Sequence, residues 1–232
     1  MFIKRKRIIL VLLSSLLVGG CQMSDEQSNE TKPVEQKPSE VAVEELPNTR
    51  ALQDEFTREM IKSTKETEKG YYTLESKTGV YEMLFPTGGE IDGIGYTRKD
   101  ESSEAFLAGI LYNDKTEALL RIKYTNALSN DETGIGYAKE LLTNSIGEDM
   151  EFDRIDGKGK VTYVAPFTMD EGLYGYAAYI HPDKGWGGVE VVYSASCVDN
   201  LKSCNPQKEK FKKRAYKLIS SVKFLNKNEA EK

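Results

Sequence analysis

Histidine, tryptophan and cysteine are scarce in this chain, whose 232 residues include one His, one Trp and three Cys. Most Ser and Cys nucleophiles need an imidazole base, so a single histidine argues against those hydrolase mechanisms. It also excludes a zinc site built from several histidines of this chain. His181 precedes Pro182 and is predicted to lie at a hairpin tip, where it serves the turn or faces water. We predict no catalytic residue, no metal ligand and no cofactor.

A membrane-spanning run is missing as well. The longest apolar stretch, Ile8 to Val18, would rise only about 16 Å as a helix, whereas the hydrocarbon core of a bilayer is about 30 Å thick. Four basic residues, Lys4 to Arg7, precede this stretch, and Gly19-Gly20-Cys21 follows it. This order of charge, short apolar run and small residues is typical of a cleaved export signal.

The end of this signal, Val18-Gly19-Gly20-Cys21, resembles the lipobox of bacterial lipoproteins. The resemblance implies that residues 1–20 are a signal peptide and that Cys21 becomes the lipidated N-terminus, carrying diacylglycerol and fatty acids such as palmitate. The protein is then expected on the outer face of the cytoplasmic membrane, in a Gram-positive cell. The alternative is an ordinary signal peptide in which small residues precede a cysteine by chance.

The exported chain is acidic. The predicted signal holds four of the 32 basic residues and none of the 37 acidic ones, so its removal changes the formal net charge from −5 to −9. This balance argues against nucleic acid as a partner.

Composition divides the exported chain into three parts. Residues 21–47 are rich in Ser, Glu, Gln, Lys, Asn and Pro and nearly free of large apolar side chains before Leu46, which predicts a disordered tether. Its root-mean-square reach as a flexible coil is roughly 30 Å. Residues 48–226 are predicted to form one domain, followed by a tail at 227–232.

Alternating and helical patterns predict three helices and nine strand segments in this domain. The helices are expected at 48–70, 131–147 and from Asn205-Pro206 to Val222. The strands are expected at 71–76, 80–85, 91–98, 104–113, 118–125, 151–155, 160–167, 173–180 and 189–195. Runs of strands with few helices between them predict an α+β fold, in which helices pack on the faces of an antiparallel sheet.

The stretch Gly79-Val80-Tyr81-Glu82-Met83-Leu84-Phe85-Pro86 resembles the opening strand of PsbP/Mog1-like domains. The later order of helix, two hairpins and a final helix running into Ser220-Ser221-Val222-Lys223-Phe224 is similar to the second half of that family. The resemblance implies a three-layer α/β/α sandwich with a role in binding or assembly, not catalysis. It assigns no functional residue.

Cys197 and Cys204 are the only cysteines that remain after lipidation of Cys21. A short extracytoplasmic loop favours a disulfide between them. A redox pair or a metal site is the alternative, although the spacing is not C-x-x-C.

The last predicted helix is the best candidate interaction surface. Its cations lie beside the apolar stripe, and we expect them to form a locally positive patch that attracts an anionic envelope polymer or an envelope protein. They are Lys208, Lys210, Lys212, Lys213, Arg214 and Lys217. The alternative is that they are only the solvated side of a packed helix.

These observations leave two alternative functions for the exported domain. The first is a non-catalytic, lipid-anchored binding domain. The second is an envelope hydrolase that uses a carboxylate pair from the densest acidic cluster, Glu148, Asp149, Glu151 and Asp153.

Overall fold

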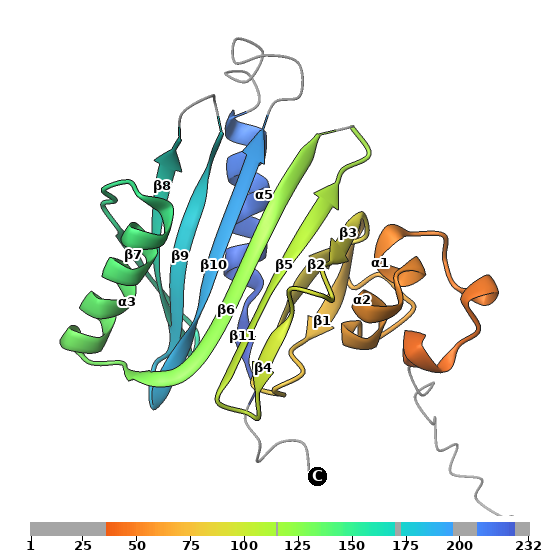
Figure 1. Ribbon diagram of the computed structural model, residues 1–232, viewed down its shortest axis with the longest axis horizontal. Helices are drawn as coiled ribbons and strands as arrows, with labels where there is room; N and C mark the ends of the chain where they lie inside the picture. Colours follow the sequence, from red (N-terminus) through yellow and green to blue (C-terminus); the bar gives the residue numbers. More distant parts are fainter. Residues whose placement is uncertain (1–35, 115, 170–172, 197–207, 226–232) are drawn as a thin grey trace, which may run out of the picture. The chain divides into compact units, whose positions relative to one another are not determined.

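A large antiparallel sheet forms the centre of the protein (Figure 1). The computed structural model describes residues 36–114, 116–169, 173–196 and 208–225. The eight strands of this central sheet are β3 (Gly89–Ile91), β4 (Thr97–Lys99), β5 (Ser103–Leu111), β6 (Glu117–Ser129), β7 (Asp153–Gly157), β8 (Lys160–Thr168), β9 (Tyr174–Pro182) and β10 (Trp186–Ser196). Their order is β3-β5-β6-β10-β9-β8-β7, with β4 also paired to β5.

A second, three-stranded sheet has the order β1-β2-β11. It consists of β1 (Tyr71–Glu75), β2 (Tyr81–Pro86) and β11 (Lys223–Phe224). The sequence pattern does not predict this second sheet. The β1–β2 hairpin pairs with the end of the chain instead of joining the central strands.

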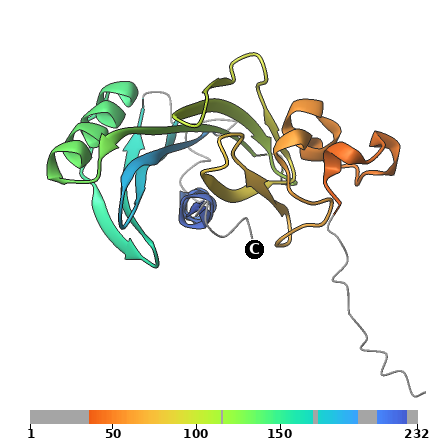
Figure 2. The same ribbon diagram turned by 90° about the horizontal axis from the view of Figure 1, so that it is seen from below.

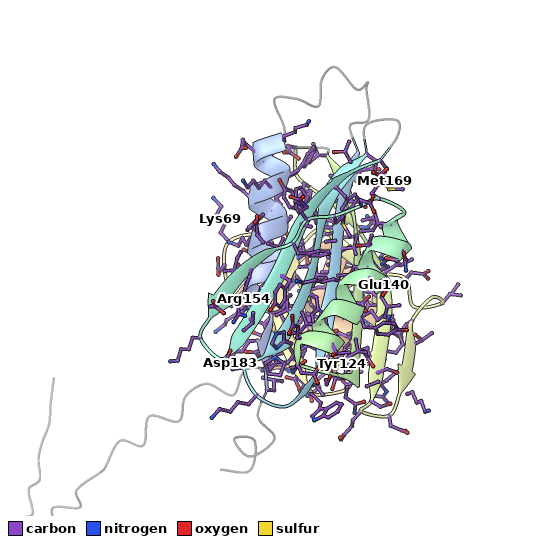
Figure 3. The ribbon with its side chains drawn as sticks, turned by 90° about the vertical axis from the view of Figure 1, so that its left-hand side faces the viewer. Lys69, Tyr124, Glu140, Arg154, Met169 and Asp183 are labelled. Atoms are coloured by element: carbon purple, nitrogen blue, oxygen red, sulfur yellow. The ribbon has the colours of Figure 1, made fainter. Side chains whose placement is uncertain are left out.

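Two long helices cover opposite faces of the central sheet (Figures 2 and 3). Helix α3 (Glu132–Ile146) lies on the face that we call outer. Helix α5 (Lys208–Ser221) packs on the other face, which we call inner. No helix of the described ranges is long and apolar enough to cross a bilayer. The protein is therefore an α+β fold, as predicted, with the small sheet as an addition to its inner side.

The main core lies on the inner face, and strand β6 shows how the sequence builds it. Leu120, Ile122 and Tyr124 are buried in this core, whereas Arg121 and Lys123 point to the opposite side. This alternation was predicted. A smaller core on the outer face holds residues of α3 against β8, β9 and β10. Burying one Leu or Phe side chain contributes about 1.5–3 kcal/mol to stability.

The predicted helix at 48–70 is wrong in its length. Two short helices, α1 (Arg50–Gln53) and α2 (Glu55–Met60), replace it. Asp54 separates them because its carboxylate accepts hydrogen bonds from the backbone N–H (2.7 Å) and the hydroxyl (2.6 Å) of Thr57, which caps α2. The chain leaves the helix at Ile61, which forms an antiparallel bridge with Leu74.

The predicted strand at 91–98 is interrupted. Strand β3 ends at Ile91 and β4 begins at Thr97. Between them the carboxylate of Asp92 accepts a hydrogen bond from the N–H of Ile94 at 3.0 Å, which is an Asx turn. The glycines on either side of Ile94 favour this turn over an extended strand.

The folded chain begins before the predicted domain start at residue 48. Two 3-10 turns, η1 (Pro38–Glu40) and η2 (Val43–Glu45), precede α1, and Pro38 and Leu46 are buried. These apolar side chains draw the end of the predicted tether onto the domain. The other predicted boundaries, for the signal, the tether and the tail, stay predictions.

Candidate functional site

Three exposed leucines lie together on the outer face of β5 and β6. The exposed fractions are 37% for Leu107, 45% for Leu111 and 47% for Leu119. In the register of the two strands, Leu107 faces Arg121, Gly109 faces Leu119 and Leu111 faces Glu117. Side chains two residues apart on a strand share a face, so the three leucines are neighbours. We call them the leucine patch.

The patch is exposed because helix α3 does not reach it. Ala138 and Leu142 of α3 pack against side chains of β8, β9 and β10. Most open antiparallel faces carry polar side chains, so leucines at these positions are unusual. The described residues include eight exposed large hydrophobic side chains, of which the patch and Tyr137 of α3 make up four. Exposed apolar patches larger than a few hundred Å² are a feature of interaction sites in proteins.

A groove adjoins the leucine patch between α3 and strands β4, β5 and β6, with a volume of about 340 Å³. It is lined by Thr97, Ser103, Glu104, Ala105, Lys123, Tyr124, Thr125, Ala127, Leu128, Tyr137 and Leu141. Ala105 faces Lys123 in the strand register, one step along the sheet from Leu107 and Arg121. The groove and the leucine patch are therefore continuous. Together we call them the outer binding face.

Polar contacts hold the floor of the outer binding face in place. The ammonium of Lys123 lies 3.2 Å from the carboxylate of Glu190, a residue that is buried. Arg121 donates a hydrogen bond to the Ser145 hydroxyl at 2.6 Å and so ties β6 to α3. Burial raises the pKa of Tyr179 to about 12, and the negative charge of Glu190 adds to this shift. The floor is thus a fixed surface with one exposed cation.

The sequence analysis missed this face, although β6 contains a signal for it. Outward positions of that strand are mostly polar, but Leu119 stands among Glu117, Arg121 and Lys123. An apolar residue at an outward position of an alternating strand indicates either that another element packs over this face of the sheet or that the face binds a partner. The sequence does not say whether a helix covers that position.

The predicted lipidation site, Cys21, and the predicted disulfide, Cys197 with Cys204, lie outside the described residues. Both stay predictions. His181 is described, and its predicted position at a solvent-facing tip is wrong. It is buried in β9, because that strand runs to Pro182 and pairs His181 with Val161. Its Nδ1 lies 2.8 Å from the carbonyl oxygen of Pro182.

The carboxylates proposed for a hydrolase are all exposed. Glu148 and Asp149 follow α3 and border an open depression with Thr143, Asn144 and Gly147. Glu151 and Asp153 lie further along the chain, at the approach to β7 and on it. Nothing in these surroundings separates one carboxylate as an acid from another as a base, which a glycosidase-like pair requires.

The structure brings the six predicted cations together on α5 but does not leave them all free for a partner. Lys210 and Arg214 both form ion pairs with Asp114 in the β5–β6 turn. Lys217 lies 2.5 Å from the carboxylate of Glu68 and over the ring of Tyr71. These three cations are therefore engaged within the protein, and the anionic-partner surface on α5 stays a prediction. The sequence could not show these ion pairs, because the acidic partners lie about a hundred residues or more away.

Arg214 is the clearest case, since its side chain is only 14% exposed. The guanidinium donates to the Thr116 hydroxyl at 2.6 Å and to Asp114 at 2.9 Å, and it stacks on the ring of Tyr112 at 3.5 Å. It fastens the β5–β6 turn to α5 through charge-assisted hydrogen bonds and a cation–π contact.

We predict that Arg214→Ala lowers the free energy of unfolding by about 1–3 kcal/mol, because it leaves Asp114 without this partner. The exposed neighbour Lys213 is the matched control, and Lys213→Ala should change stability by no more than about 0.5 kcal/mol. Urea denaturation of the three proteins measures both values. Equal midpoints for the two variants would show that the Arg214 contacts contribute nothing.

Comparison with known proteins places the chain in a family. The family model described as "Putative lipoprotein YvcA" matches residues 47–223. The "Putative lipoprotein YvcA" of Bacillus subtilis (strain 168) is 31% identical over 245 residues, which cover 95% of this chain and 97% of that protein. Among solved structures, the Ran-binding protein Mog1p of Saccharomyces cerevisiae is 12% identical, with a TM-score of 0.46, over 68% of this chain and 97% of Mog1p. A mutant of protein Mog1 is 11% identical, with a TM-score of 0.47 over the same shares.

The fold and the family match together define a lipoprotein with a Mog1-like α+β domain. Within that class, the chain belongs to the YvcA lipoprotein family. The resemblance to PsbP/Mog1-like domains, predicted from the strand around Tyr81 and the order of the later elements, is confirmed.

Proposed function

We propose that this lipoprotein is anchored through Cys21 on the outer face of the cytoplasmic membrane of a Gram-positive cell, where its outer binding face holds an apolar segment of a protein partner. The single observation that carries the binding role is the leucine patch. A partner that covers all three leucines would gain roughly 2–4 kcal/mol from their half-exposed surface, before the cost of ordering is subtracted.

The chemistry of the face favours a protein over a polysaccharide or a polyanion. The centre of the patch carries aliphatic side chains, which hydrated sugars and phosphates do not cover well. The two cations of the face already have partners, since Lys123 lies 3.2 Å from Glu190 and Arg121 donates to the Ser145 hydroxyl. The adjoining groove offers Tyr137 and Leu141 as further apolar walls. These features suit an amphipathic segment whose apolar side chains enter between α3 and β5.

The rival function, an envelope hydrolase, has weaker support. Its candidate carboxylates are solvated, and the described residues contain no cluster of three or more His, Cys, Asp or Glu able to hold a metal ion. We therefore retain binding as the proposed role.

The test is co-purification from intact cells after chemical cross-linking. A double variant, Leu107→Lys with Leu119→Lys, places two cations on the patch. The control is Ile155→Lys, because Ile155 is similarly exposed, at 44%, but lies on the edge strand β7. We expect a defined partner with the wild type and the control and at least a tenfold loss with the double variant, at unchanged melting temperature. The same partners in all three samples would contradict the proposal.

A further inference from the structure

A cavity of about 600 Å³ opens at the end of α5, on the inner side of the protein. It lies where the β7–β8 turn and the end of β9 meet the C-terminus of α5 and strand β11. Its lining residues are Lys158, Gly159, Lys160, Pro182, Ser220, Ser221, Val222, Lys223 and Phe224. These described residues include three lysines and no Asp or Glu, in a chain with a net charge of −5. We call this cavity the lysine pocket.

Lys160 forms the inner wall of the pocket. Its ammonium donates to the carbonyl oxygen of Ser220 at 2.6 Å and to that of Val222. These bonds satisfy carbonyl groups at the end of α5. Burial lowers the pKa of Lys160, and no carboxylate pairs with it among the described residues. An ammonium has three N–H donors, so one remains for a ligand.

The other two lysines stand at the rim. Lys158 is exposed in the β7–β8 turn, and the described residues include no ion-pair partner for it. Lys223 lies 3.1 Å from Glu82, and that single carboxylate also pairs with Lys62 at 3.0 Å. Lys62 also pairs with Glu75 at 3.2 Å, so these two carboxylates balance Lys62 and Lys223. The unbalanced positive charge of the pocket is that of Lys158 and Lys160. The pocket therefore keeps a positive potential, and its low-dielectric walls strengthen the attraction of an anion.

We propose that the lysine pocket binds the phosphate group of a phosphate ester. Three lysines line one cavity, and two of them, Lys158 and Lys160, have no carboxylate partner among the described residues, so their charges are available to phosphate oxygens. The cavity exceeds the size of a phosphate ion, and Pro182 and Phe224 supply apolar wall for an attached organic group. The phosphate can belong to a soluble ester or to a lipid headgroup. This site is separate from the outer binding face.

The test is calorimetric titration of the full-length lipidated protein in neutral detergent, with inorganic phosphate and glycerol 3-phosphate as probes. Lys160 is left intact because it caps α5. The double variant Lys158→Ala with Lys223→Ala removes both rim lysines. The control for loss of charge is Lys69→Ala, because Lys69 is exposed and lies outside the pocket lining. We expect saturable binding of glycerol 3-phosphate by the wild type and the control, and binding about tenfold weaker in the double variant.

A second arm separates the two sources of phosphate. The protein is placed in nanodiscs of neutral lipid or of neutral lipid mixed with phosphatidylglycerol, and the glycerol 3-phosphate titration is repeated. Weaker apparent binding in the anionic nanodiscs, absent in the double variant, assigns the pocket to a lipid headgroup. Equal binding in both nanodiscs assigns it to a soluble ester. No binding of either probe, or equal binding by the wild type and the double variant, overturns the proposal.

Discussion

Cells that express the Cys21→Ala variant should contain only an uncleaved precursor without lipid. Lipidation requires a thiol at the position that follows Gly20, and the two remaining cysteines lie far along the chain, at positions 197 and 204. A diacylglycerol anchor holds a protein on a bilayer through the burial of its methylene groups, each worth about 0.8 kcal/mol. The variant should therefore lose the anchor altogether.

Incorporation of radiolabelled palmitate measures this result directly. The wild type should be labelled at the size of the mature protein, and Cys21→Ala should be unlabelled and larger by the signal peptide. The matched control, Cys197→Ala with Cys204→Ala, should keep its label. Label retained in the Cys21→Ala variant would contradict the assigned anchor.

Replacing Glu104 should cause a large loss of stability, because this buried side chain joins three segments of the domain. This carboxylate is buried, with 1% of the residue exposed. It accepts hydrogen bonds from the Lys77 N–H at 3.0 Å, the Thr78 hydroxyl at 3.3 Å and the Tyr96 hydroxyl at 2.9 Å. Burial and the bond to Glu104 raise the pKa of Tyr96. Three segments, the β1–β2 turn, the β3–β4 loop and β5, are thus joined at one side chain.

Glu104→Ala leaves the Lys77 N–H and the Tyr96 hydroxyl without this acceptor in a part-buried environment, whereas the Thr78 hydroxyl keeps the Ser76 hydroxyl as an acceptor at 3.0 Å. We expect a loss of roughly 2–4 kcal/mol, since each unsatisfied buried donor costs about 1–3 kcal/mol and part of that cost is relieved by relaxation. For a domain of this size the melting temperature should fall by about 10 °C. Glu104→Gln keeps one acceptor oxygen and should lose about half as much.

Calorimetry of the two variants measures these shifts, with the exposed Glu117→Ala as the control for loss of a carboxylate from a strand. That control should melt within about 2 °C of the wild type. A Glu104→Ala variant that melts together with Glu117→Ala would show that the buried carboxylate does not hold the three segments.

Local patterns predicted most elements because they depend on neighbours in the sequence. Alternation along β6 and the apolar face of α3 with its C-terminal Gly147 are examples, and both appear as expected. Long-range pairing was not predictable in this way. The pairing of β11 with β2 joins segments about 140 residues apart, and no periodicity records it.

For the candidate sites too, local features were predictable from the sequence and long-range contacts were not. A sequence reveals that α5 is basic, but only the fold shows that Asp114 and Glu68 engage three of its cations. Likewise, only the fold shows that the lysines of the pocket, which come from the β7–β8 turn, β8 and β11, line one cavity. The leucine patch depends on how far α3 extends across the sheet, which is a property of packing rather than of local pattern.

Binding of a protein partner by the outer binding face can be tested by site-specific photo-cross-linking in intact cells. A photoreactive phenylalanine analogue is placed at Leu119, in the leucine patch, or at Ile155, on the edge strand β7. We expect a discrete cross-linked product from position 119 that disappears when Leu107→Lys is added, and no such product from position 155. No cross-link from position 119, or the same product from both positions, would show that this face does not hold a partner.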